Sequence, residues 1–240
     1  MKTIKQDLRA DLNLVPWLRD LPDEIMDPLI LATRRAQLVD QEPVARRGQL
    51  LTHLVIVVNG RLSLNLVSQS GRRHVLGQLR RSQVLGLIPV IEQSTGIYNV
   101  DSLGPSEVMM LSGDAFLHAV TQYQPLSMAL IKVMCARSRR LQEFLAARNL
   151  HPMVVQLALL LLDITTLYGH IPSNIERGVE LHLTQLDLAD MLGISRQSLH
   201  QNIQKLQALG LIDLSYTRVR IADISVLQRW LDKQGCEHLL

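Results

Sequence analysis

The chain has 240 residues, with 25 Lys or Arg against 22 Asp or Glu, a formal net charge of only +3 at pH 7 and 47% hydrophobic residues, which is enough for two domains with their own cores. It has no apolar run near the ~20 residues of a membrane-spanning helix and no apolar signal region at its start, so we expect a cytoplasmic protein without a membrane partner. Two cysteines, Cys135 and Cys236, are too few for a disulfide scaffold or a four-thiolate iron–sulfur site.

The N-terminal half changes from a helical to a strand-like pattern. Residues 5–33 predict one or two short amphipathic helices, the second of which can open at Pro22. From about Ala36 the period is two, and Asn59-Gly60 is a strong hairpin signal because both residues tolerate a positive φ. Strands are expected over residues 54–58, 61–67, 73–79, 97–102 and 108–111. Short strands at this regular spacing predict a small roll or barrel.

A long helix follows, from Pro125 to about Leu150. Apolar residues recur along it at alternating spacings of three and four, as in the seam of a coiled coil, so the sequence predicts a homodimer. The residues of this seam are Ile131, Met134, Ser138, Leu141 and Leu145. The alternative is a helix packed on its own domain. His151-Pro152 breaks the helix, because proline disfavours α geometry in the residue before it. We therefore expect domains at residues 1–124, 125–150 and 151–240, the last opening on a buried helix, 153–168.

Residues 183–207 predict two helices joined by a tight turn. Thr184 can cap the first helix with Asp187 reaching back, Gly193 supplies the positive φ that ends it, and Ser195 can cap the second. The apolar stripes are Leu188, Ala189 and Leu192 on the first helix and Leu199, Ile203 and Leu206 on the second. This layout is typical of a helix-turn-helix, whose second helix enters the DNA major groove. An ordinary helical hairpin is the alternative.

The residues after these helices strengthen the DNA-binding interpretation. Residues 210–214 and 216–221 alternate, which predicts the short β-hairpin of a winged helix, and Asp223 can cap a last helix. Bulk charge gives no support, because residues 151–240 carry seven Lys or Arg against nine Asp or Glu, and residues 1–150 carry 18 against 13. The prediction depends instead on local placement of Arg196, Lys205, Arg218 and Arg220.

Taken in order, the roll, long helix, break and winged helix resemble the cyclic-AMP receptor protein and fumarate–nitrate regulator (CRP/FNR) family of bacterial transcription factors. The resemblance covers about residues 20–235. Its carriers are the glycines Gly48, Gly60, Gly71 and Gly86, the helix Gln156–Asp163, and above all Gly193-Ile194-Ser195-Arg196-Gln197-Ser198. It implies an α+β fold with an N-terminal cyclic-nucleotide-binding-like β-roll, a long dimerisation helix and a C-terminal winged helix-turn-helix. It also implies a homodimeric regulator whose partners are double-stranded DNA and, for an activator, RNA polymerase.

Departures from the family pattern concern the effector. Family members that bind cyclic nucleotides use a Gly-Glu-Leu segment and, about ten residues later, Arg followed by Ser or Thr, since the Arg fork suits a phosphate. Here those places hold an effector pocket without its polar anchors, formed by Gly86, Leu87, Ile88, Ile97 and Tyr98. We therefore expect no control by cyclic AMP, no evident cofactor and an unknown effector. The cysteine cluster of the oxygen-sensing branch is missing, whereas a haem-sensing branch stays open because of His53, His74 and His118.

The expected DNA contacts come from the second helix and the hairpin: Thr184, Ser195, Arg196, Gln197, Ser198, His200, Gln201, Lys205 and Arg218. Arg196 suits the O6/N7 edge of guanine. The resemblance places Gln197 and Gln201 where relatives have Glu and Arg, and Gln suits the N6/N7 edge of adenine. An enzyme is disfavoured because the chain has no P-loop, Gly-x-Ser-x-Gly, His-Glu-x-x-His or Cys-x-x-Cys. A further alternative is an effector-binding or interaction module without DNA readout.

Overall fold

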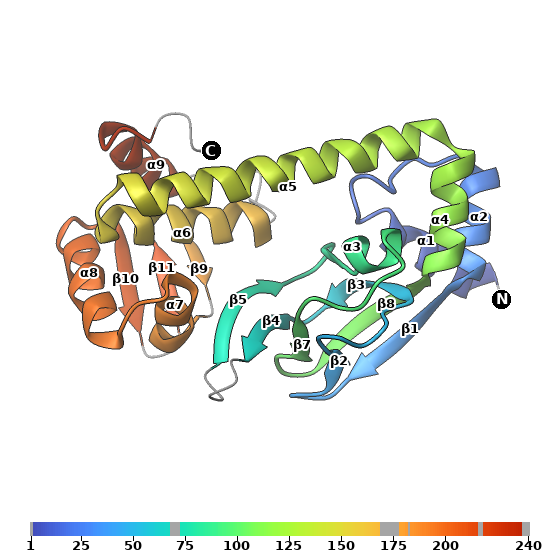
Figure 1. Cartoon of the computed structure of the whole chain (residues 1–240), viewed down its shortest axis with the longest axis horizontal. Helices are drawn as coiled ribbons and strands as arrows, with labels where there is room; N and C mark the ends of the chain where they lie inside the picture. Colours follow the sequence, from blue (N-terminus) through green and yellow to red (C-terminus); the bar gives the residue numbers. More distant parts are fainter. Residues whose placement is uncertain (1, 68–72, 169–177, 182, 216–217, 237–240) are drawn as a thin grey trace. The chain divides into compact units, whose positions relative to one another are not determined.

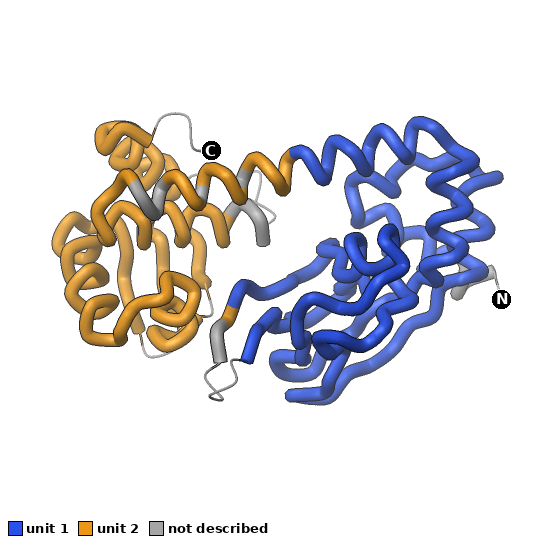
Figure 2. Tube along the Cα trace, viewed as in Figure 1, with its two compact units in different colours: residues 1–72, 76–135 blue, residues 73–75, 136–240 orange. Residues whose placement is uncertain are grey.

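The computed structural model describes the chain except for residues 1, 68–72, 169–177, 182, 216–217 and 237–240 (Figure 1). It forms two compact units, residues 1–72 with 76–135 and residues 73–75 with 136–240 (Figure 2). The division falls inside the long helix α5 (Gln124–Leu150), and the functional boundaries expected at residues 125 and 151 remain proposals. In the described part of the chain, no helix is both long and apolar enough to cross a membrane.

Helices cover one side of the first unit. They are α1 (Lys2–Leu12), α2 (Asp23–Leu31), α4 (Gly113–Gln122) and the first half of α5. Pro22 is the N-cap of α2, as predicted. These helices bury Leu12, Leu29 and Phe116 in one apolar cluster, where the Trp17 ring meets Phe116 edge-on with centroids 5.8 Å apart. Burial of such side chains contributes roughly 1.5–3 kcal/mol each.

Two four-stranded sheets form the roll, with strand orders β1-β8-β3-β6 and β2-β7-β4-β5. The strands are β1 (Thr33–Leu38), β2 (Pro43–Ala45), β3 (His53–Asn59), β4 (Leu62–Val67), β5 (Arg73–Leu79), β6 (Val84–Leu85), β7 (Asn99–Ser102) and β8 (Ser106–Ser112), with a short helix α3 (Leu87–Ile91) after β6. Leu54 and Ile56 pack against the helices, whereas Val55 and Val57 pack in the cluster between the sheets. This double burial explains the unbroken apolar run of β3.

The hairpin expected at Asn59-Gly60 is wrong, although the turn itself is present. Gly60 has φ 84°, but β3 pairs with β8 and β6 in one sheet while β4 pairs with β7 in the other. The turn therefore carries the chain between sheets. A Cβ on Gly60 would lie 2.7 Å from Ser106 Cα, so the glycine is also required by close approach to β8.

The second unit is helical around a small sheet. It contains the second half of α5, α6 (Met153–Tyr168), α7 (Gln185–Leu192), α8 (Arg196–Ala208) and α9 (Ile224–Lys233), with strands β9 (Val179–Leu181), β10 (Ile212–Ser215) and β11 (Arg218–Ile221) in the order β10-β11-β9. Helix α6 is buried as predicted, with Leu157 and Leu161 fully enclosed. Asp223 caps α9 as predicted, because its Oδ1 accepts from Ser225 N at 2.7 Å.

Candidate nucleic-acid interface

The predicted cap of α7 is confirmed as a complete capping box. Asp187 N donates to Thr184 Oγ1 at 3.1 Å, and Thr184 N donates to Asp187 Oδ2 at 3.1 Å. The Thr184 hydroxyl also donates to that carboxylate at 2.9 Å. Two otherwise unsatisfied N–H groups at the helix start are thereby paired. The hydroxyl of Thr184 is thus used in capping α7. Its contact with DNA stays a prediction.

The turn between α7 and α8 also has the predicted geometry. Gly193 adopts the left-handed conformation at φ 66°, and Ile194 N returns to Ala189 O at 3.0 Å. Ala189 is buried, so its small side chain allows the two helices to pack closely. Ser195 then caps α8, its Oγ accepting from Ser198 N at 3.2 Å. The start of α8 thus presents N–H groups and a positive helix end, the environment that a phosphate prefers.

Helix α8 has one apolar and one polar face, and this pattern was predicted. Its buried side chains are Leu199, Asn202, Ile203 and Leu206, of which the three aliphatic ones were expected. Its exposed side chains include Arg196, Gln197, His200, Gln201 and Lys205, whereas Ser198 is half-buried. Gln197 and Gln201 stand one turn apart on the exposed face. The candidate base-reading residues therefore lie together on the exposed face of a helix whose opposite face is packed in the core.

Two polar contacts on α8 had no signal in the sequence pattern. Asn202 is 6% exposed, and its Nδ2 donates to Ser198 O at 2.7 Å, so the buried amide is bonded within the helix. His200 Nε2 lies 3.0 Å from Gln204 Nε2 on the exposed side. This second contact orients the His200 ring beside the candidate contact surface.

The predicted wing is present as β10 and β11. Val219 and Ile221 face the core, and Arg218 and Arg220 are exposed on the other face. The turn residues of the hairpin lie outside the described residues. Strand β9 adds a third strand that was not predicted, and it brings Glu180 Oε1 within 2.8 Å of Arg218 Nη1. One expected DNA contact, Arg218, is therefore held in an ion pair.

The residues of the expected effector pocket do not share one environment. Gly86 has φ 98°, and a Cβ there would lie 2.8 Å from His53 O, so the backbone requires glycine. Leu87 is 1% exposed in the cluster under the helices, whereas Tyr98 packs against the cluster between the sheets. Ile88 is half-buried and Ile97 is exposed.

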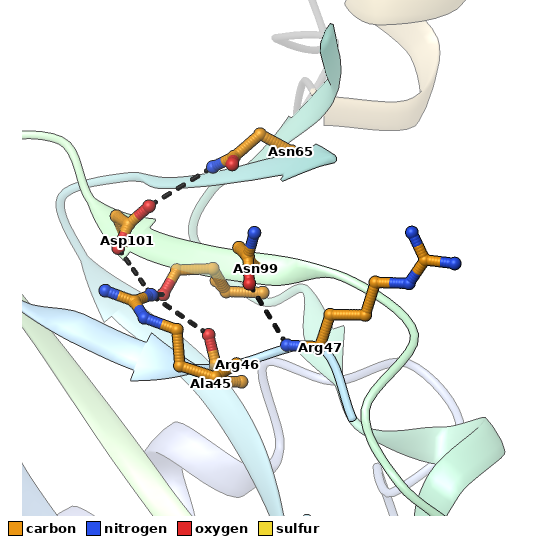
Figure 3. A network of polar contacts seen from close by, with 7 residues as sticks. Ala45, Arg46, Arg47, Asn65, Asn99 and Asp101 are labelled. Carbon is orange, nitrogen blue, oxygen red and sulfur yellow. Dashed lines mark hydrogen bonds and ion pairs between the residues drawn. The ribbon is translucent and has the colours of Figure 1, made fainter. Parts of the chain in front are cut away.

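A polar network next to these residues was missed by the sequence analysis. Arg46 Nη1 donates to Asp101 Oδ1 at 2.6 Å, and Asn65 Nδ2 donates to Asp101 Oδ2 at 3.2 Å, which ties the residue after β2 to β7 and β4 (Figure 3). Arg47 N donates to Asn99 Oδ1 at 3.1 Å, and the Arg47 guanidinium extends away from the network (Figure 3). Both carboxylate oxygens of Asp101 are thus engaged within the sheet, which gives the network a structural role.

The expected seam of α5 is largely open to solvent in the single chain. Ile131, Leu141 and Leu145 are 54%, 60% and 52% exposed. Ser138 is exposed and Met134 is half-buried. Exposed aliphatic side chains at this spacing are typical of a helix that packs against another helix.

Among the described side chains, His53 and His118, two of the three histidines left open for haem, do not gather with other candidate metal ligands. His53 Nδ1 lies 2.8 Å from Thr52 Oγ1, and the side chain of His74 lies outside the described residues. Across the described ranges, no group of three or more His, Cys, Asp or Glu side chains could hold a metal ion.

Comparison with known proteins places both halves of the chain. Residues 155–230 match the model of the Crp-like helix-turn-helix domain, and residues 35–123 match that of the cyclic nucleotide-binding domain. A CRP-like cAMP-activated global transcriptional regulator of Mycobacterium tuberculosis is 22% identical over 82% of this chain and 89% of its own length.

Two solved structures show the same fold. FixK2 from Bradyrhizobium japonicum has a TM-score of 0.68 at 12% identity, covering 82% of this chain and 96% of that one. A CRP-family transcriptional regulator from Thermus thermophilus has a TM-score of 0.62 at 20% identity, covering 82% and 96%.

Proposed function

The chain belongs to the CRP/FNR family of transcriptional regulators, and from this membership we propose that it acts as a homodimer on a two-fold symmetric site in double-stranded DNA. The observation that supports this best is the exposed face of α8, which carries Arg196, Gln197 and Gln201 directly after the helix N-cap. A surface of this kind fits the major groove, which admits one α-helix.

We further propose a division of labour on this surface. Arg196 contacts guanine, and Gln197 and Gln201 contact adenine, so the half-site keeps one guanine and is richer in A·T than the sites of relatives with Glu and Arg there. Ser195, Ser198, His200, Lys205 and, from the neighbouring elements, Thr184 and Arg218 contact phosphate. Such contacts fix the register of the protein on the duplex without reading sequence.

The dimer is proposed to form through α5. Its exposed Ile131, Leu141 and Leu145 repeat at the spacing of a coiled-coil seam, with Met134 and Ser138 between them. Two copies would bury these side chains against each other and place two α8 helices on successive major grooves.

We also propose that cyclic AMP does not control the protein, although the Mycobacterium tuberculosis relative is cAMP-activated. Leu87 stands where binders have an anchoring carboxylate, and its side chain is buried under the helices. Ile97 stands where a phosphate partner is expected. A phosphate placed there would bear its desolvation cost without its partners. The proposal leaves RNA polymerase as a partner in the case of an activator, and the cytoplasm as the location.

The test of function is binding of the full-length protein to random-sequence and selected duplexes at several salt concentrations. We expect affinity that falls steeply with salt and a selected site with two similar half-sites. Salt-independent or undetectable binding would favour an effector-binding or interaction module that does not read DNA, an alternative that leaves the exposed face of α8 without a role.

A further inference from the structure

The exposed face of the wing sheet carries alternating charges. Arg218 and Arg220 point outward from β11, while the core side holds Val219 and Ile221. Arg220 is in register with Asp213 on β10 and with Glu180 on β9. An acidic residue therefore stands across from Arg220 on each neighbouring strand, whereas Arg218 is in register with Ser215 on β10.

One of these acidic residues makes a defined contact. Glu180 Oε1 lies 2.8 Å from Arg218 Nη1, although Glu180 is opposite Arg220, so the carboxylate reaches diagonally to the arginine next to the hairpin turn. The side chains of Arg218 and Glu180 are 54% and 43% exposed, so water and salt screen the ion pair. Such a pair is weak enough for a DNA phosphate to replace the carboxylate.

Arg218 is also at the end of the unit where α8 begins. Strand β10 starts soon after the C-terminal end of α8 and runs alongside that helix toward its N-terminal end (Figure 1). Strand β11 begins there, after the hairpin turn that follows β10. Arg218 is the first residue of β11. We therefore expect a duplex docked on the exposed face of α8 to pass near the end of β11 that carries Arg218.

We propose that Glu180 is a restraint on DNA affinity: it occupies Arg218 in the free protein, so the wing gains a phosphate contact only by giving up an ion pair. This inference rests on the proposed DNA-binding function. The carboxylate also repels approaching phosphates. Both effects lower the sequence-independent affinity that would otherwise hold the protein on any DNA.

The test compares Glu180→Gln with the wild type on a random-sequence duplex. We expect about three- to five-fold tighter binding at ~50 mM salt and a salt dependence steeper by about one unit, because one more cation becomes available to phosphate. The gain should shrink toward zero at ~200 mM salt. Unchanged or weaker binding by Glu180→Gln would overturn the proposal.

Two controls separate the ion pair from net charge. Asp213→Asn removes the same charge from the same exposed face, but the described residues give its carboxylate no ion pair, so its gain should be clearly smaller. In an Arg218→Gln background, Glu180→Gln should bring no gain, as in a double-mutant cycle. Equal gains from both acidic variants, or a gain that survives without Arg218, would mean that only net charge matters and would overturn the proposal.

The outcome for the wild type keeps the two hypotheses apart. If the wild-type protein fails to bind any duplex, the proposed function fails, and this inference falls with it. If the wild type binds but Glu180→Gln does not differ from it, only the restraint is wrong. Glu180 and Asp213 are both exposed, and unchanged thermal unfolding of the variants checks that they are folded.

Discussion

Single side chains on α8 make separable predictions because specific and sequence-independent contacts respond differently to truncation. Arg196→Ala should cost about 1–3 kcal/mol on the preferred site and relax the preference at one base pair, since a bidentate guanine contact is lost. Lys205→Ala should weaken binding to all sequences alike, because a phosphate contact carries no sequence information. Selection of binding sites from a random pool, performed with each variant, measures both effects. An Arg196→Ala protein that selects the same guanine would contradict the assignment.

The two glutamines are tested in the same experiment. Gln197→Ala and Gln201→Ala should each lose the preference for an A·T pair, because the amide is the group that suits the N6/N7 edge of adenine. The exposed Gln207, near the end of α8 and off the stripe of Gln197 and Gln201, serves as the matched control and should leave the preference unchanged when replaced by Ala. Recovery of a G·C-rich half-site by the wild type, with no effect of either substitution, would rule out this assignment.

The two thiols should differ sharply in reactivity. Cys135 is exposed, whereas Cys236 is 0% exposed, with its Sγ 3.6 Å from His151 Nε2. Burial raises the pKa of the Cys236 thiol above its ordinary 9.0, and the charge of Asp232 adds to this. A thiol reagent at pH 8 should therefore modify Cys135 quickly and Cys236 only on unfolding. Labelling of Cys135→Ser, which we expect to be near zero until denaturant is added, is the measurement.

The same shift gives a pH dependence of stability. The folded chain retains a proton on Cys236 that the unfolded chain releases, so this group lowers the free energy of unfolding as pH rises past about 9.

Hydrogen bonds from Ser225 and Val226 lower the pKa of Asp223, the cap of α9, so its contribution is present above pH 3.8 and is lost as pH falls further. Unfolding midpoints of Asp223→Asn should accordingly approach those of the wild type in acid.

At the scale of elements, local chemistry allowed prediction where it was strong. Caps and positive-φ turns depend on a few adjacent residues, so Thr184, Gly193, Ser195 and Asp223 were placed correctly. Long helices were equally clear, because apolar periodicity accumulates over many turns. Strands β2, β6 and β9 have two or three residues each, too few to show a period, and they were missed.

Pairing was harder to predict than local structure. Asn59-Gly60 gives a turn in any context, but which strands then pair is decided by residues far away in the chain, here by β8 and β7. For the same reason, the ion pair of Glu180 with Arg218 was not foreseen, since the sequence separates its partners by a helix-turn-helix. The exposure of Arg196, Gln197 and Gln201 on α8, by contrast, depends on the period of one helix and could be predicted from the sequence.

The turn after β3 gives an element-scale prediction with an internal control. Gly104→Ala should cost about 1 kcal/mol, because φ is +77° but no atom lies within 4 Å of a new Cβ. Gly60→Ala has a similar φ of +84° and places its Cβ 2.7 Å from Ser106 Cα, so it should cost about 1–3 kcal/mol more. Urea unfolding in a Trp230→Phe background, followed by Trp17 fluorescence, reports on this unit alone. Equal costs would mean that the approach to β8 does not matter.

At the scale of the whole molecule, the oligomeric state depends on what covers the exposed seam of α5. Leu141→Glu should convert a dimer to a monomer at micromolar concentration, because packing against the partner would desolvate an unpaired charge. Ala136→Glu is the matched control: it adds the same charge to the same helix at an exposed position two residues before Ser138, away from the seam, and it should leave the dimer intact. Sedimentation equilibrium of both variants decides between the dimer and a helix that serves only its own domain.

The consequence for DNA follows directly, because two half-sites about one helical turn apart, ~34 Å, can be read together only by linked copies. Leu141→Glu should thus bind one half-site as well as the wild type does but lose the gain from the second. A monomeric variant that still prefers the double site would mean that the copies are joined elsewhere.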